Sequence, residues 1–226
     1  MPTIVLTSPK GGAGKSTTAV ILATELARME YPVTVLDCDL VSAEKSAMKI
    51  WASVGAIPPG ITLRHGVTEQ DVIREIMEAE GKGHIVLVDL GGAASLLATR
   101  AISQADLVLV PIRPSPLDAA SAELIVHMIY LEEQTLRRQI TWAAVLTATS
   151  QIKSAQHKAI IADLKAAEAT VIEPELMQRG AFQNFFVKGQ GGDLHTMTPT
   201  ATHEKAIENA QAFTRSVLTL LAKVAA

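Results

Sequence analysis

The stretch PKGGAGKS at residues 9–16 has the residue types and the spacing of a loop that binds phosphate. Its three glycines allow the backbone to approach an anion closely, and the N–H groups that open the following helix can donate to that anion. Lys15 is placed to reach the terminal phosphate oxygens, and the Ser16 hydroxyl is placed to bind Mg²⁺. A glycine-rich turn without a ligand is the alternative, but the strand-like and helix-like runs on either side of the loop favour phosphate binding.

The loop departs from the usual pattern of Gly, four residues and Gly-Lys-Ser/Thr at its start. Pro9 stands where the opening glycine is expected, and a second lysine, Lys10, follows it. A single nucleotide already has Lys15 for its terminal phosphates, so the pattern leaves open what Lys10 does.

Three acids follow apolar runs that are typical of buried strands. Asp89 closes the run HIVLVDL, and Asp37 and Asp39 close the run that ends in VLDCD. Ligands of α/β sheets bind at the carboxyl ends of the strands, so carboxylates at these positions can hold Mg²⁺ or orient a water molecule. The alternatives are a helix-capping role for Asp89 and a turn with capping acids at residues 37–39.

The composition of the 226 residues suits one domain with an aliphatic core, because 48% of them are hydrophobic and only 4% are aromatic. The net charge of −3 provides no overall attraction to nucleic acid, so any binding of that kind needs a local basic patch. A lone cysteine, Cys38, forms no internal disulfide, and no signal peptide or membrane-spanning run is present. These features predict a cytoplasmic protein.

Strand-like and helix-like segments alternate along the chain, and most of the strands are apolar on both faces. This pattern predicts an α/β fold, a mostly parallel twisted sheet with helices on both faces. The expected strands are residues 3–8, 32–37, 61–65, 84–90, 106–112, 141–148 and 169–176. The expected helices are residues 16–30, 42–54, 68–81, a segment that starts near 91–95, 115–134, 152–167 and 202–224. Residues 186–200 are the most loop-like stretch and the one expected to be mobile.

Several stretches together resemble the ParA/MinD group of P-loop ATPases. KGGAGKST matches the deviant Walker A box of that group. The stretch VPIRPSPLDAASAELIV at residues 110–126 resembles small ParA-type partition proteins, and MQRGAFQNFFVKGQGGDLH resembles those proteins and the related VirC-type transfer protein. The resemblance covers nearly the whole chain and implies a P-loop NTPase fold with ATP and Mg²⁺ as ligands.

The resemblance also implies roles for individual residues. The nucleotide-binding box comprises Lys10, Gly11, Gly12, Ala13, Gly14, Lys15, Ser16 and Thr17. In this group two protomers enclose two ATP molecules, and the first lysine of each box, here Lys10, reaches the partner's phosphates much as an arginine finger does. Asp39 would position the attacking water and act with Lys10 and Lys15 in hydrolysis. Ser16, Asp37 and Asp89 would support the metal, and residues 89–95 would form the second switch.

Leu40 and Val41 depart from the Pro-Gln that commonly follows the second aspartate in this group, and the stretch from Asp39 to Trp51 is longer than in the small relatives. The first switch is therefore the part of the site that the resemblance defines least.

Within the group, the sequence is most similar to the small ParA branch. A single cysteine excludes the iron–sulfur carriers, and the expected first strand begins at residue 3, which leaves no helix-turn-helix domain before it. The last helix carries apolar residues at helical spacing and few basic ones, so we expect it to face the core rather than a membrane. The branch implies an ATP-bound homodimer, non-specific DNA binding at the nucleoid, a centromere-binding partner and plasmid partition.

Two other functions remain open. The same engine could move a protein cargo or transfer machinery, or the chain could be a nucleotide-gated repressor or adaptor with negligible turnover. The basic residues considered for DNA contacts are Arg137, Arg138, Lys153, Lys158, Lys165, Arg179 and Lys188. The six histidines show no metal-ligand spacing, and the adenine pocket is expected near residues 147–150 and Pro174.

Overall fold

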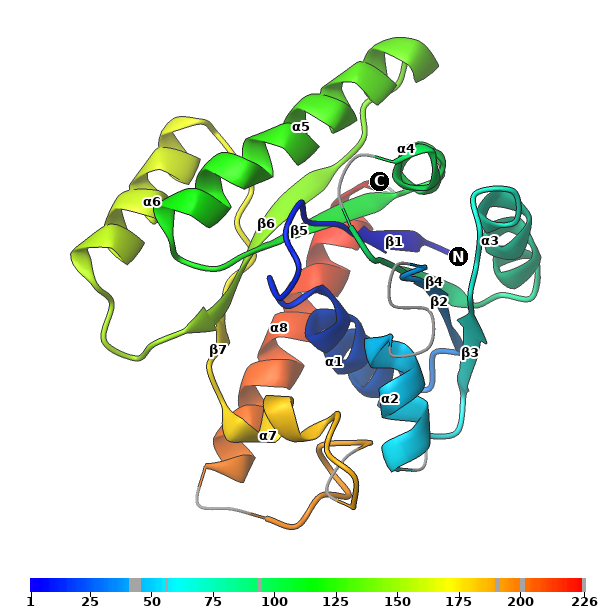
Figure 1. Cartoon of the computed structure of the whole chain (residues 1–226), viewed down its shortest axis with the longest axis vertical. Helices are drawn as coiled ribbons and strands as arrows, with labels where there is room; N and C mark the ends of the chain where they lie inside the picture. Colours follow the sequence, from blue (N-terminus) through cyan, green and yellow to red (C-terminus); the bar gives the residue numbers. More distant parts are fainter. Residues whose placement is uncertain (41–45, 56, 93–94, 190–191, 200–201, 225–226) are drawn as a thin grey trace.

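The sheet lies at the centre of the molecule, with its strands in the order β3-β2-β4-β1-β5-β6-β7 (Figure 1). The computed structural model describes residues 1–40, 46–55, 57–92, 95–189, 192–199 and 202–224. All strand pairs in this part of the chain are parallel. The strands are β1 (Thr3–Leu6), β2 (Val33–Cys38), β3 (Ile61–His65), β4 (Ile85–Leu90), β5 (Leu107–Ile112), β6 (Trp142–Thr149) and β7 (Leu176–Met177).

Helices cover both faces of this sheet (Figure 1). Each face has its own apolar core. The helices are α1 (Lys15–Arg28), α2 (Ala47–Val54), α3 (Val72–Gly81), α4 (Leu96–Ser103), α5 (Pro116–Leu136), α6 (Ala155–Ala166), α7 (Gly180–Asn184) and α8 (His203–Val224). Side chains alternate between the faces along each strand. In β1, Ile4 and Leu6 belong to the core that includes residues of α1 and α8, whereas Val5 belongs to the core that includes residues of α3, α4 and α5. The parallel α/β fold predicted from the sequence is confirmed.

The order of the strands creates a switch point at β1. Strand β1 pairs with β4 on one side and with β5 on the other, and the loop of residues 7–14 follows its carboxyl end. Ligands of open α/β sheets bind in the crevice at such a point. The fold therefore places the glycine-rich loop where a ligand site is expected.

The prediction of a strand over residues 169–176 was wrong. Only an isolated bridge between Ala144 and Val171 and the two-residue strand β7 form there. Pro174 interrupts the segment, because proline has no N–H to donate to a neighbouring strand. The short helix α7 was not anticipated, and α3 begins at Val72 rather than at residue 68. The first residues of the expected helix 42–54 lie outside the described residues, and α2 covers Ala47–Val54.

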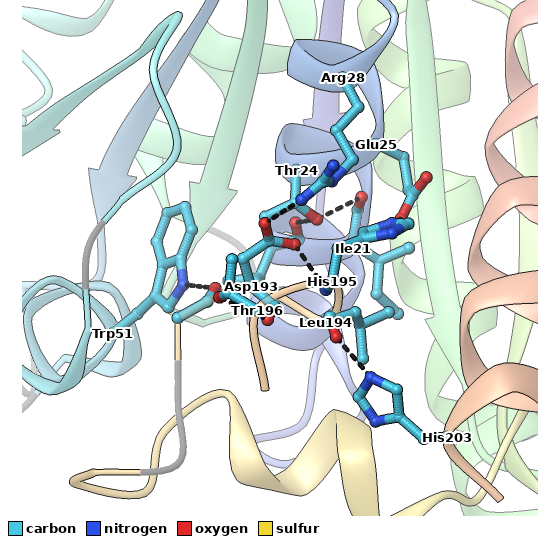
Figure 2. A network of polar contacts seen from close by, with 12 residues as sticks. Ile21, Thr24, Glu25, Arg28, Trp51, Asp193, Leu194, His195, Thr196 and His203 are labelled. Carbon is cyan, nitrogen blue, oxygen red and sulfur yellow. Dashed lines mark hydrogen bonds and ion pairs between the residues drawn. The ribbon is translucent and has the colours of Figure 1, made fainter. Parts of the chain in front are cut away.

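The described part of residues 186–200 contains no helix or strand, but it is fixed to the core by polar contacts (Figure 2). Asp193 Oδ2 accepts a hydrogen bond from Arg28 of α1 at 2.6 Å, and His195 Nε2 lies 2.8 Å from Glu25 Oε1. Trp51 Nε1 of α2 donates to the Gly192 carbonyl at 2.6 Å. Residues 192–195 of this loop therefore contact both α1 and α2, although the sequence of the loop suggested mobility.

Helix α8 packs on the core through one face, as the spacing of its apolar residues predicts. Ala206, Ala210, Phe213 and Val217 are buried, while Val224 at its end is exposed. Among the described residues, no helix has the length and apolar character needed to cross a bilayer.

Candidate functional site

The loop between β1 and α1 has the backbone shape of an anion cradle. Gly12 and Gly14 have φ angles of 78° and 98°, a left-handed region that glycine adopts without strain. Gly14 also sits against β6, because a Cβ at this position would lie 3.2 Å from the Thr147 side chain. Thr147 Oγ1 donates to the Ala13 carbonyl at 2.6 Å and holds that carbonyl away from the cradle. The local structure therefore requires two of the glycines that the motif supplies, Gly12 and Gly14.

Ser16 and Asp89 meet at the start of α1. Ser16 Oγ donates to Asp89 Oδ2 at 2.6 Å, and the register of β1 and β4 brings Asp89 beside the end of β1. The other carboxylate oxygen, Asp89 Oδ1, is buried and has no hydrogen-bond partner among the described residues. Carboxylate and hydroxyl oxygens are ligands that Mg²⁺ prefers, and a buried carboxylate oxygen without a hydrogen-bond partner is suited to bind a cation. Ser16 and Asp89 thus fit a magnesium site.

Burial changes the ionisation of the two main charged groups here. Desolvation raises the pKa of Asp89 to about 7, with the nearby Asp37 and Asp39 adding to the rise and the Ser16 hydrogen bond and Lys15 opposing it. Burial lowers the pKa of Lys15 despite the attraction of Asp89 and Asp39. Lys15 Nζ donates to the Lys10 carbonyl at 3.2 Å, which holds the ammonium beneath the loop. A magnesium-bound phosphate group would supply a positive charge beside the Asp89 carboxylate and a negative charge beside the Lys15 ammonium.

The structure separates the two aspartates of the β2 end. Asp37 is buried, and its carboxylate accepts from Ser46 Oγ at 2.6 Å and from the Asp39 N–H at 3.3 Å, with His65 Nδ1 3.0 Å away. Asp39 is half-buried and lines the cleft beside Gly91. Asp39 therefore lines the cleft, whereas Asp37 is not among its described lining residues and holds the end of β2 through its hydrogen bonds with Ser46 and the Asp39 N–H. A metal role for Asp37 stays a prediction, and residues 41–45, 93 and 94 of the expected switches lie outside the described residues.

A cleft of about 450 Å³ extends from the loop across the ends of β5, β6 and β7. One end is formed by Gly11, Gly12 and residues 14–18 of the loop and the start of α1, and the other by residues 176–179 and α7. Leu176, Met177, Phe182 and Phe186 give this second end an apolar wall suited to a flat base. The adenine pocket was expected near residues 147–150 and Pro174, and of these Thr147 and Ala148 line the cleft, whereas Pro174 is not among its described lining residues. The place of adenine stays a prediction, and the apolar wall comes from residues 176–186, whose strand and helix the sequence did not reveal.

The two lysines of the loop lie in different environments. Lys15 is buried under the loop and lines the cleft. Lys10 Nζ instead forms an ion pair with Asp118 Oδ1 of α5 at 3.0 Å, and 44% of the Lys10 side chain is exposed. Lys10 is not among the described residues that line the cleft. Lys15 therefore lies at the cradle, whereas Lys10 is held at its rim.

Sequence reasoning missed one basic residue of the cleft and assigned another to a different surface. Arg113 follows β5 and lines the cleft near Gly12. Arg179, considered for DNA contacts, also lines the cleft, and its Nε atom is buried without a partner in the described chain. Arg113 could have been identified from its position directly after a strand, because ligands bind at the carboxyl ends of strands. That inference also requires knowing that this strand, β5, lies beside β1.

The other basic residues considered for DNA contacts lie on the surface. Arg137, Lys158, Lys165 and Lys188 are exposed. Arg138 donates to the Ser103 carbonyl at 2.7 Å, and Lys153 pairs with Glu175 at 2.7 Å. These last two side chains therefore already have partners within the chain.

Comparisons with known proteins agree with this geometry. Residues 4–190 match the model of the CobQ/CobB/MinD/ParA nucleotide binding domain. A protein ParA of Rhizobium radiobacter is 43% identical over 96% of this chain and 96% of its own length. A maintenance of carboxysome distribution protein A of Gloeobacter kilaueensis is 28% identical over 81% of this chain and 82% of its own.

Among solved structures, a putative plasmid partition protein from Borrelia burgdorferi B31 bound to AMPPNP has a similar fold. It superposes with a TM-score of 0.69 over 97% of this chain and 99% of its own, at 16% identity. At this level of identity the likeness concerns the fold alone.

Proposed function

The chain belongs to the CobQ/CobB/MinD/ParA family of nucleotide-binding domains, and from its site we propose that it is an ATPase that positions DNA cargo. In this proposal the ATP-bound protein is a homodimer in the cytoplasm, binds the nucleoid without sequence preference and partitions a plasmid together with a centromere-binding protein. The 43% identical protein ParA supports the partition role.

The binding of ATP and Mg²⁺ is supported by the fit of the residues. The cradle at residues 11–16 offers backbone N–H groups to phosphate, and Lys15 lies beneath it. Ser16 and the unpartnered oxygen of Asp89 would hold Mg²⁺, which would neutralise phosphate charge. The apolar wall of residues 176–186 would receive the base.

Hydrolysis in this proposal depends on Asp39 and on two lysines. The Asp39 carboxylate lines the cleft and would accept a hydrogen bond from the attacking water, which orients the water toward the phosphate. Lys15 would stabilise charge on the phosphate of its own protomer. Lys10 would stabilise the phosphate of the partner protomer, as an arginine finger does.

The observation that carries the dimer proposal is the position of Lys10. The ammonium group is held at the rim by Asp118 instead of turning into the cleft of its own chain. A lysine at the rim is placed to reach a second protomer that faces it. Its charge would stabilise the dimer only when triphosphates are bound. This arrangement couples the oligomeric state to the bound nucleotide.

A second candidate is the positioning of a protein cargo by the same ATP-driven dimer. The 28% identical relative, named for the maintenance of carboxysome distribution, supports it. Both candidates share the nucleotide site and the dimer, and they differ in the partner that stimulates turnover.

The proposed function is tested by DNA binding in defined nucleotide states. The wild-type protein with a non-hydrolysable ATP analogue and Mg²⁺ should bind a random-sequence duplex, and the affinity should fall steeply with salt because phosphate contacts release counterions. With ADP, or in the Lys15→Ala variant, binding should be lost. A strong preference for one sequence at fixed salt would instead indicate a repressor, and no DNA binding with the analogue would contradict the proposal.

A further inference from the structure

Arg113 is a cation in the cleft that the mechanism above does not use. It follows β5 directly, and β5 lies beside β1 in the sheet, so its backbone emerges next to the glycine-rich loop. Pro114 comes next and restricts the conformation of Arg113, while the Ser115 N–H donates to the Arg113 carbonyl at 2.6 Å. The short turn leads into α5, whose first turn is capped by Ser115 Oγ. The backbone from which the Arg113 side chain extends is therefore well fixed.

The guanidinium group of Arg113 lies over the loop. Its Nη2 atom is 3.7 Å from the position that a Cβ on Gly12 would occupy, and the residue lines the same cleft as Gly11–Thr18. The side chain is exposed and has no hydrogen-bond or ion-pair partner in the part of the chain that the structure describes. The acid of the neighbouring helix turn, Asp118, is already paired with Lys10.

The charges around this guanidinium favour an anion. Lys15 is buried beneath the same loop, where it donates to a neutral carbonyl and is attracted by Asp89 and Asp39, so the loop has cationic groups on two sides. Two like charges near one cavity repel each other until an anion lies between them. The loop N–H groups and the start of α1 add positive potential at the same place.

We infer that Arg113 is a phosphate-binding residue that contacts the phosphate chain of the nucleotide from the same protomer. The inference rests on the proposed nucleotide site and adds a residue to it. The base end of the cleft lies at β7 and α7, two strands away from β5, so Arg113 is placed for the phosphates and not for the base. Arginine suits this role because its planar group presents several donors to phosphate oxygens.

The inference is tested by calorimetry with the Arg113→Gln variant and two probes. The probes are a non-hydrolysable ATP analogue with Mg²⁺ and inorganic tripolyphosphate with Mg²⁺. Loss of a hydrogen bond to a charged group should weaken the binding of both probes to Arg113→Gln by about tenfold. The matched control is Arg215→Gln, which removes an exposed arginine from α8, outside the residues that line the cleft, and should bind both probes as the wild type does. The thermal midpoint of each variant should equal that of the wild type, because both side chains are exposed.

The outcomes separate this inference from the proposed function. An Arg113→Gln protein that binds both probes like the wild type overturns the inference alone. If only the ATP analogue weakens while tripolyphosphate does not, Arg113 contacts the base or the ribose and the inference is wrong. Normal binding combined with lost dimerisation places the guanidinium on the partner and also overturns it. A wild-type protein that binds neither probe overturns the proposed function together with the inference.

Discussion

Lys10 and Asp118, which are far apart in sequence, form an ion pair of 3.0 Å between the loop that follows β1 and the first turn of α5. Asp118 is largely buried, while Lys10 is partly exposed. In the proposed dimer Lys10 has to leave this partner in order to reach the phosphates of the other protomer. The pair therefore competes with dimerisation, and breaking it should change the amount of nucleotide that dimerisation needs.

Asp118→Asn should lower the concentration of ATP analogue at which half of the protein is dimeric by about two- to fivefold, since a partly exposed ion pair contributes at most about 1 kcal/mol. Analytical ultracentrifugation at increasing analogue concentration measures this shift. Glu123→Gln removes an exposed acid from the same helix and serves as the control. If Asp118→Asn needs as much analogue as the wild type, or more, then Asp118 does not restrain Lys10.

Gly91→Ala should slow ATP hydrolysis by about tenfold or more while nucleotide binding stays close to normal. A Cβ on Gly91 would lie 2.5 Å from Asp39 Oδ1 and 2.7 Å from Asp39 Cα, so Asp39 has to move, and small displacements of a catalytic group reduce rates strongly. Asp39→Ala should give the same phenotype. Phosphate-release assays measure turnover, and calorimetry measures binding.

Gly81, at the end of α3 and outside the described residues that line the cleft, is a matched control for this substitution. A Cβ at Gly81 would meet no described atom within 4 Å, and neither Gly81 nor Gly91 has a positive φ angle. Gly81→Ala should therefore hydrolyse ATP at the wild-type rate. Equal rates for the two alanine variants would refute the role assigned to the contact between Gly91 and Asp39.

Asp89→Asn should remove a pH dependence from the stability of the metal-free protein. Burial raises the pKa of Asp89 to about 7, whereas an unfolded chain has an aspartate pKa of about 3.9. Between these values the folded state holds a proton that the unfolded state has lost, so the wild type loses stability as the pH rises from about 4 to about 7. The loss has a slope of up to about 1.4 kcal/mol per pH unit.

Urea unfolding of both proteins at pH 5 and pH 8 with a chelator measures this effect. Asparagine stays neutral, so Asp89→Asn should exceed the wild type in free energy of unfolding at pH 8, and the difference should shrink at pH 5. A difference between the two proteins that is the same at both pH values would show that Asp89 does not titrate in this range.

The sequence predicted the parts of the site that are local in the chain. The apolar runs before Asp37 and Asp89 indicated buried strands, and the glycines and the helix-forming run around Lys15 indicated the cradle. The register of β2 with β4 then brings Asp37 beside Asp89, as two adjacent parallel strands require.

The remaining parts depend on contacts between distant segments. The pair of Lys10 with Asp118 and the approach of Arg113 to Gly12 exist because β5 lies next to β1, which no local pattern encodes. The apolar wall at α7 was missed because Pro174 and the polar residues 178–179 obscure the short strand and helix there. Residues 186–200 looked mobile because a loop gives no local sign that Asp193 will pair with Arg28.

The central claim is that the second lysine of PKGGAGKS acts across a dimer. Sedimentation of Lys10→Ala with a non-hydrolysable ATP analogue and Mg²⁺ tests it most directly, with calorimetry on the same sample to record binding. The variant should bind the analogue nearly as the wild type does, because Lys15 and the loop N–H groups remain, and it should stay monomeric at concentrations where the wild type is dimeric. A Lys10→Ala protein that dimerises like the wild type, or one that no longer binds the analogue as a monomer, would contradict the claim and assign Lys10 to its own nucleotide or to no nucleotide at all.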